Sequence, residues 1–157
     1  MKTSLICAAL ICAGLAAPAA SARDAALAVP IHKMMEGFNK GDVAMVKAVH
    51  VAAPTIVDNV PPFLWSGPQS FDHWLSDLSK SEAKEGKTDG VVWFGESVDE
   101  AVSGNHAYLV APARYTFKQN GHAMRETGMV AFVLAKEGGA WKVQAWSWAS
   151  PHAVPVK

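Results

Sequence analysis

Several residue types that define common functional sites are scarce in this chain. Its two cysteines, Cys7 and Cys12, both lie in the apolar first segment, and none of the six histidines forms a His-x-His or His-x3-His pair. Nothing therefore predicts a dedicated zinc site. The sequence also lacks a Gly-x-Ser-x-Gly elbow and a glycine-rich phosphate loop after a strand. These absences argue against covalent hydrolase, nucleotide-binding and redox-cofactor functions, and we expect no metal and no cofactor.

Charge of one sign is lacking as well. The chain has 14 basic and 14 acidic residues, so its formal net charge is zero. A basic face is the usual sign of binding to nucleic acid or to anionic lipid, because both partners carry dense negative charge. We therefore expect no nucleic-acid partner and no membrane association once the first segment has been removed.

The first 22 residues have the pattern of a cleaved secretory signal. Lys2 gives a positive start, Leu5 to Ala17 form an apolar run, and Ala20-Ser21-Ala22 has the small-x-small pattern of a cleavage site. The run is too short to cross a bilayer core of about 30 Å. We expect an exported protein, periplasmic or extracellular. A lipoprotein anchored through Cys12 is the alternative, although Ala9 stands where a leucine is usual.

Cleavage after Ala22 would leave one domain, residues 23–150, followed by a tail of residues 151–157. Neither cysteine would remain, so the mature chain would have no disulfide. Apolar residues at helical spacing predict a first helix (Leu27, Ile31, Met34, Met35, Phe38). A short second helix is expected over 43–49, capped by Asp42, and a third over about 69–79 (apolar stripe Phe71, Trp74, Leu75, Leu78).

The third helix would turn His73 to solvent, and residues 80–89 would form a loop. The second half of the chain, after this loop, has the character of a β-sheet. One strand is expected at 55–59, before that helix. Residues 91–102 predict one long strand or two with a bulge near Gly95, and further strands follow at 106–118, 122–136 and 140–149, separated by turn signals such as Asn120-Gly121. Helices first and antiparallel strands afterwards indicate an α+β domain.

This order of elements resembles the NTF2-like superfamily, and within it the SnoaL-like branch. The resemblance rests on the short helices with Gly41-Asp42 between them, the strand and bend from Thr55 to Gly67, and the ending Gly138-Gly-Ala-Trp-Lys-Val-Gln-Ala-Trp-Ser-Trp148. It implies a strongly curved antiparallel sheet that the helices close into a cone with an internal pocket, often in a dimer. The superfamily hosts isomerases, dehydratases and cyclases as well as domains without a known reaction, so the fold alone does not select a function.

Alternation along the last strand suggests which side chains face the pocket. Lys142 and Gln144 should be wet, which would place Trp146 and Trp148 with them on the outer face. Two indoles on a polar face would form a dimer interface, pack under the tail of residues 151–157, or bind a ligand. The opposite face would then turn toward the pocket with small side chains (Val143, Ala145, Ser147).

Asp58 is the candidate acid, because it follows an apolar strand and precedes an aromatic cluster. If it points inward, burial by Phe63, Trp65 and Trp74 would raise its pKa and favour proton transfer. The alternative is a carboxylate that binds the turn amides near Asn59. Tyr115 could donate to a ligand oxygen or be a core tyrosine. Arg125 and Glu126 suggest a surface pair more than an anion site.

Three functions remain open from the sequence. The first is an exported domain that binds a small, largely apolar molecule, with Trp65, Trp74, Tyr115, Val143, Ala145 and Ser147 around it and Asp58 as its polar contact. The second is an isomerase or cyclase similar to ketosteroid isomerase, in which Asp58 shuttles a proton and Tyr115 polarises a carbonyl. The third is a dimeric interaction module, which depends on Trp146 and Trp148.

Overall fold

The computed structural model describes residues 24–157, so the expected signal segment lies outside the described residues. The expected helices and strands occur in the expected order, with two additional short strands at Leu64–Ser66 and Val154–Pro155. Three helices come from the first half of the chain: α1 (Ala25–Lys40), α2 (Val43–Ala48) and α3 (Ser70–Glu85). The strands are β1 (His50–Val57), β2 (Leu64–Ser66), β3 (Lys87–Phe94), β4 (Asp99–Ser103), β5 (His106–Gln119), β6 (His122–Glu137), β7 (Ala140–Ala149) and β8 (Val154–Pro155).

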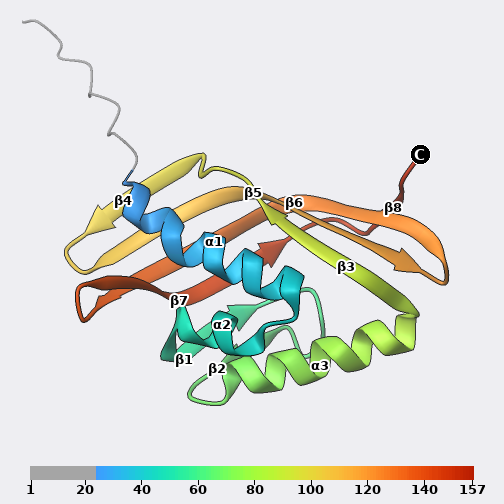
Figure 1. Cartoon of the computed structure of the whole chain (residues 1–157), viewed down its shortest axis with the longest axis horizontal. Helices are drawn as coiled ribbons and strands as arrows, with labels where there is room; N and C mark the ends of the chain where they lie inside the picture. The colour runs from blue at the N-terminus through green and yellow to red at the C-terminus, as the bar shows by residue number, and fades with distance from the viewer. Residues whose placement is uncertain (1–23) are drawn as a thin grey trace, which may run out of the picture.

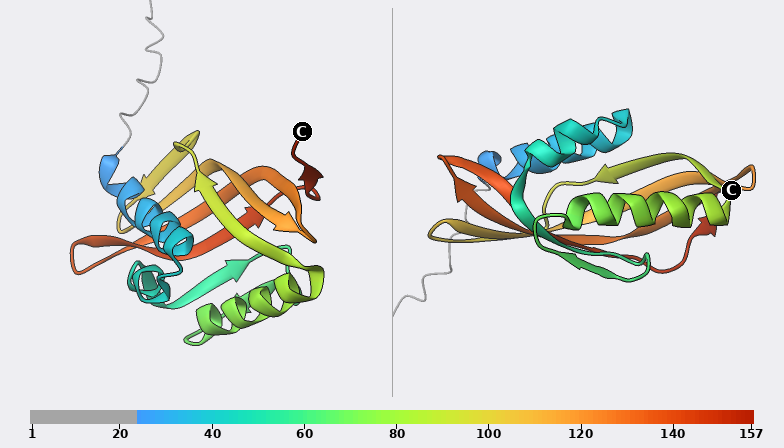
Figure 2. Two further views of the ribbon diagram at one scale, coloured as in Figure 1. Left: turned by 45° about the vertical axis from the view of Figure 1, so that its right-hand side comes forward. Right: turned by 90° about the horizontal axis from the view of Figure 1, so that it is seen from below.

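The eight strands form one curved sheet in the order β2-β1-β7-β6-β5-β3, with β4 paired to β5 and β8 to β6. Figure 1 shows α1 crossing one face of this sheet and α3 lying beside β1 and β2. Seen from below, α1 and α2 lie above the sheet (Figure 2). The α+β expectation is confirmed. The sheet is not entirely antiparallel, however, because β1 pairs with β7 in parallel.

Local sequence explains the helix ends. Asp24 and Asp42 accept hydrogen bonds from the backbone amides of Ala26 and Met45, which caps α1 and α2 as short acidic side chains do. The expected cap at Asp42 is confirmed. Gly41 ends α1 with a φ of 67°, a conformation that glycine adopts without steric cost.

Helix α3 is longer than the sequence predicts. The loop expected over residues 80–89 is wrong, because α3 continues to Glu85 and β3 begins at Lys87. The last two turns are polar and have no apolar stripe, but they consist largely of residues with good helix propensity, such as Lys, Glu and Ala. This extension matters for function, because it brings the second half of α3 alongside β3 and Tyr115.

The tail contains a short strand, β8. Residues 151–157 are not a free end, because Val154 pairs with Arg125 and Pro155 with Met124 at the edge of β6. Of the two alternatives for residues 91–102, the structure has two strands, β3 and β4, separated by a short segment after Phe94. No helix among residues 24–157 is long and apolar enough to span a membrane.

The core lies between α1 and the concave face of the sheet. Its fully buried side chains come from the helix and from alternating positions on the strands, which is the pattern expected of a sheet with one covered face. Together with Val46 of α2, these residues are Leu27, Met34, Ile56, Leu109, Val130, Phe132, Leu134 and Val143. Toward the C-terminal end of α3 this core gives way to a cavity.

Candidate functional site

A cavity of about 310 Å³ lies between the helices and the concave face of the sheet. Aromatic side chains form one part of its wall and polar side chains form another. The aromatic residues are Phe38, Trp74, Phe94, Tyr115, Trp146 and Trp148. The charged residues are Asp58, Glu82, Lys87, Asp89 and Glu126. This volume is at the low end of the range that small-molecule sites occupy in proteins.

Asp58 is held in the cavity wall by two hydrogen bonds. It follows the last residue of β1, and its Oδ2 accepts from the indole Nε1 of Trp74 at 2.7 Å. Its Oδ1 accepts from the backbone amide of Asn59 at 2.6 Å. The carboxylate therefore does both things that the sequence allowed, because it faces the cavity and it also binds a turn amide. Burial raises the pKa of Asp58, and the hydrogen bond from Trp74 opposes that rise.

The aromatic bend after Asp58 contributes less than the sequence suggests. Phe63 and Leu64 are more than half exposed, so they do not bury Asp58. Trp65 is buried but is not among the cavity residues, because β2 is the edge strand beyond β1 and lies under α3. Its Nε1 donates to Asp77 of α3 at 3.1 Å. The expected place of Trp65 in the pocket is therefore wrong.

Trp146 and Trp148 face the cavity, and their expected position on the outer face is wrong. Trp146 is 5% exposed, and its ring meets the ring of Trp74 edge-on, with centroids 5.0 Å apart. On the neighbouring strand, Phe132 pairs with Trp146 and Val130 with Trp148, and both partners are fully buried in the core. The inner face of β7 is therefore aromatic at this end of the sheet.

A register shift in β7 is the physical reason for this error. Leu134 pairs with Val143 and Val133 with Ala145, so Gln144 is an extra residue between them. A bulge of this kind reverses the alternation of side chains beyond it. Val143 stays on the inner face, in the core, whereas Ala145 and Ser147 fall opposite Val133 and Ala131 on the other face. The expected places of Ala145 and Ser147 in the pocket are wrong, and Val143 is not among the cavity residues.

Tyr115 lines the cavity but its hydroxyl is already engaged. It donates to Glu82 Oε1 at 2.5 Å, from β5 to the unexpected second half of α3. Burial, followed by the hydrogen bond to Glu82, raises the pKa of Tyr115 well above its ordinary value. Tyr115 is therefore a neutral donor whose proton is directed toward a carboxylate.

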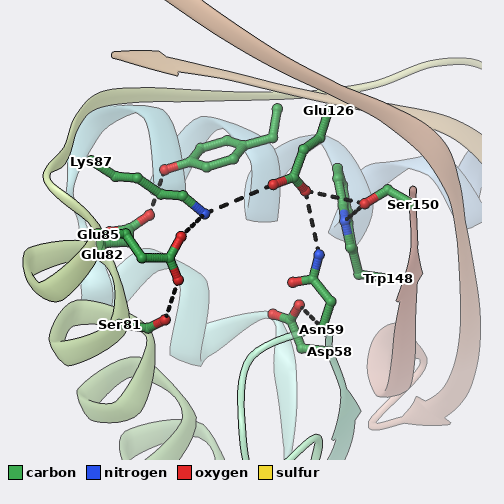
Figure 3. Close-up of polar contacts among 10 residues, drawn as sticks. Asp58, Asn59, Ser81, Glu82, Glu85, Lys87, Glu126, Trp148 and Ser150 are labelled. Carbon is green, nitrogen blue, oxygen red and sulfur yellow. Dashed lines mark hydrogen bonds and ion pairs between the residues drawn. The ribbon is translucent and has the colours of Figure 1, made fainter. Parts of the chain in front are cut away.

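Glu126, which the sequence suggested as one half of a surface pair, is a principal residue of the site. Its side chain is 9% exposed, and β5–β6 register places it beside Tyr115 on the concave face. Ser150 Oγ donates to its Oε2 at 3.1 Å, and Asn59 Nδ2 donates at 3.4 Å (Figure 3). The expectation of a surface pair with Arg125 is wrong. Residues two apart on a strand share a face, so counting back along β6 from Leu134 through Phe132 and Val130 leads to Glu126 and predicts that it lies on the buried face.

Lys87 and Trp148 complete the polar wall. Lys87 Nζ lies 3.0 Å from Glu85 Oε2 and 3.9 Å from Glu126 Oε1, and 4.8 Å from the centre of the Phe117 ring. Trp148 Nε1 donates to Ser150 Oγ at 2.7 Å, which in turn donates to Glu126. Figure 3 shows these groups converging from α3, β3, β6 and the segment after β7.

No group of three or more histidine, cysteine or acidic side chains within residues 24–157 is placed to hold a metal ion. His73 is exposed on α3, as expected. The polar wall therefore consists of carboxylates, one ammonium group and neutral hydrogen-bond donors. Such a wall can bind polar groups of a ligand and can accept a proton at Asp58, whose raised pKa makes it a stronger base than an exposed aspartate.

The comparison with known proteins agrees with this architecture. No protein-family model matches the chain, and no curated protein matches it in sequence. Its structure is similar to an NTF2-like superfamily protein from Salmonella enterica, with a TM-score of 0.63, 16% identity, and coverage of 79% of this chain and 87% of that one. The chain therefore has the NTF2-like cone fold to which the sequence resemblance pointed.

Two further structures of this fold have names that imply enzymes. A ketosteroid isomerase-like protein from Erwinia carotovora matches with a TM-score of 0.60 and 17% identity, covering 85% of this chain and 95% of that one. A hexachlorocyclohexane dehydrochlorinase matches with a TM-score of 0.65 and 10% identity, covering 82% and 88%. These similarities concern the fold alone. Which ligand or reaction this chain supports depends on its own cavity residues.

Proposed function

We propose that this protein binds a small, largely apolar molecule in its cavity, with a polar group of the ligand placed near Asp58. The observation that carries the proposal is the composition of the wall, in which aromatic rings (Trp74, Trp146) adjoin the buried carboxylate of Asp58. Aromatic surfaces supply most of the binding free energy in such sites, and a few polar groups fix the orientation of the ligand.

A thermal-shift screen of hydrophobic metabolites tests this proposal. A ligand present at about 100 times its dissociation constant should stabilise the protein by about 2.7 kcal/mol. Asp58→Asn should reduce the shift produced by any true ligand. Asp72→Asn is the matched control, because Asp72 is an exposed acid on α3 that pairs with Lys47. Absence of any hit in a broad library would contradict the proposal, and a shift that Asp58→Asn leaves unchanged would remove Asp58 from the site.

A proton-transfer enzyme, an isomerase or cyclase, is the second candidate. The observation in its favour is that Asp58 faces the cavity and that burial raises its pKa, which suits a general base. Tyr115 fits the role of polarising a carbonyl less well, because its proton is directed to Glu82. The dehydrochlorinase of the same fold acts, by its name, on an apolar ring, so this fold is compatible with such a substrate. Loss of turnover in Asp58→Asn with retained ligand binding would distinguish catalysis from binding.

We also propose that the protein is exported and forms a homodimer. Export is supported by the signal-like segment of residues 1–22, and N-terminal sequencing after expression in a Gram-negative host should give Arg23 as the first residue.

A dimer interface at Trp146 and Trp148 loses its support, because both face the cavity. The outer face of β5 and β6 carries exposed apolar side chains instead, Tyr108 and Met129. Met129→Glu should convert a dimer to a monomer in light scattering.

A further inference from the structure

The charges around the cavity are unbalanced. Among the described residues that line it, four are acidic (Asp58, Glu82, Asp89, Glu126) and one is basic, Lys87. Asp89 is exposed and pairs with Lys118 at 2.9 Å, so it is compensated from outside. Three carboxylates therefore face a single ammonium group, which leaves a formal excess of two negative charges in the cavity wall.

The partners of these three carboxylates are mainly neutral. Asp58 accepts from Trp74 Nε1 and from the Asn59 amide, and Glu82 accepts from the Tyr115 hydroxyl. Glu126 accepts from Ser150 Oγ and Asn59 Nδ2, with Lys87 at the longer distance of 3.9 Å. Neutral donors orient a carboxylate and stabilise its charge, but they do not cancel the electrostatic potential that it creates in a partly enclosed space.

Aromatic rings adjoin this negative region. The indole and phenyl rings of Trp74 and Phe38 meet edge-on with centroids 5.6 Å apart, and Trp146 meets Trp74 at 5.0 Å. The face of an aromatic ring carries partial negative charge and attracts ammonium groups. Lys87 makes both kinds of contact at the margin of the cavity, because its ammonium Nζ lies 4.8 Å from the centre of the Phe117 ring and 3.0 Å from the carboxylate of Glu85.

We propose that the ligand of the cavity is a small organic cation, an amine whose ring lies against the tryptophans and whose ammonium group lies between Asp58 and Glu126. This inference rests on the proposed binding function, because it names the chemical class of the molecule that the same cavity takes. An ammonium group would compensate the excess negative charge, and its apolar body would contact Trp74 and Trp146. A ligand carboxylate would instead need Lys87, whose ammonium is already shared by Glu85 and Glu126.

Three indoles of similar shape and different charge test this proposal: tryptamine, which is a cation at neutral pH, neutral 3-ethylindole, and anionic indole-3-propionate. Calorimetric titration of the purified protein with each should give tryptamine at least about tenfold higher affinity than 3-ethylindole, and indole-3-propionate the weakest. Added salt should reduce the advantage of tryptamine, because salt screens partly exposed charges.

Removal of one negative charge provides the second arm of the experiment. Glu126→Gln should lower tryptamine affinity about tenfold and leave 3-ethylindole affinity unchanged, since the amide keeps the shape and the acceptor oxygen. Asp72→Asn, which removes an exposed charge outside the cavity, should change neither affinity. If Glu126→Gln lowers the melting temperature so far that it cannot be titrated, Asp58→Asn gives the same comparison.

The outcomes separate the two proposals. Equal affinity of tryptamine and 3-ethylindole, or tighter binding of indole-3-propionate, would overturn the cation proposal and leave the apolar binding function standing. Unchanged tryptamine affinity in both Glu126→Gln and Asp58→Asn would also overturn it. Failure of all three indoles to bind would overturn the cation proposal, and the metabolite screen would then decide the broader binding function independently.

Discussion

The indole Nε1 of Trp74 donates a hydrogen bond to Asp58 Oδ2 at 2.7 Å, and this contact joins α3 to the end of β1 inside the cavity. The donor favours the ionised form of Asp58 and partly offsets the effect of burial on its pKa. The strength of this hydrogen bond sets how far the pKa of Asp58 rises, and therefore how readily Asp58 accepts a proton from a ligand in the cavity.

Trp74→Phe should therefore raise the pKa of Asp58 further. Loss of one hydrogen bond to a charged group costs about 1.5 to 3 kcal/mol, and one pH unit corresponds to about 1.4 kcal/mol, so the pKa of Asp58 should rise by about one to two pH units. Carbon-13 NMR titration of the Asp58 carboxyl group measures it. Trp93→Phe, at an exposed indole over Arg114, is the control. An unchanged titration midpoint would show that the hydrogen bond does not act on Asp58.

Asp58→Asn should alter the pH dependence of stability. The folded-state pKa of Asp58 lies above the ordinary aspartate value of 3.8, so its contribution to stability is fully present below pH 3.8 and is lost as pH rises through the folded-state pKa. The wild type should gain stability relative to Asp58→Asn as pH falls through that window, by at most about 1.4 kcal/mol per pH unit. Urea unfolding across acidic pH measures the difference. A constant difference would contradict this account.

His50 should contribute with the opposite sign. It is 4% exposed, its Nδ1 lies 2.7 Å from the carbonyl oxygen of Val46, and burial lowers its pKa below 6.5. Its stabilising contribution is present above pH 6.5 and is lost as pH falls through the folded-state pKa, with a slope of at most about 1.4 kcal/mol per pH unit. His50→Gln should flatten this loss in urea unfolding, whereas the same substitution at exposed His73 controls for the glutamine itself.

Trp146→Ala should destabilise the protein strongly. Truncation of a buried tryptophan costs about 3 to 5 kcal/mol, because apolar contacts are lost and the neighbouring side chains close the space only in part. Guanidinium unfolding measures the change. Trp93→Ala is the matched control, since Trp93 is 42% exposed and should cost far less. Similar costs for the two variants would mean that Trp146 does not face inward.

Gly128→Ala should push the middle of β6 away from the end of β7. A Cβ at Gly128 would lie 2.1 Å from the Ala149 carbonyl oxygen, a backbone atom that cannot move aside cheaply. Overpacking of this kind costs about 1 to 3 kcal/mol, and it should also disturb the Ser150–Glu126 hydrogen bond nearby. Chemical denaturation compares this variant with Thr127→Ala, its exposed neighbour. Wild-type stability of Gly128→Ala would contradict the close approach.

The order of elements was predictable because it follows from local signals. Helical spacing of apolar residues marked α1, the cap at Asp42 marked α2, and the Asn120-Gly121 pair marked the turn between β5 and β6. The length of α3 was not predictable from its apolar stripe, because the last turns toward Glu85 are polar. That omission concealed Glu82, the partner of Tyr115.

The site was predicted only in part, because strand faces depend on long-range pairing. Asp58, Trp74 and Tyr115, three of the residues that the sequence suggested for the site, do line the cavity. Glu126 was missed because a charged residue beside a turn resembles surface, although its alternation with Val130 places it inside. Trp146 was misplaced because alternation was carried through Gln144 without the bulge.

The extra residue Gln144 divides β7 into two segments, and the alternation of inward and outward side chains is offset by one residue between them. Before it, the inner positions serve the core through Val143; after it, the inner positions furnish the cavity with Trp146 and Trp148. Deletion of Gln144 alone would remove the bulge and leave Val143, Trp146 and Trp148 on the inner face, because the remaining residues of β7 match the register of β6 one to one. β7 therefore carries one residue more than its pairing with β6 requires, and the aromatic wall of the cavity is compatible with a strand that is one residue shorter.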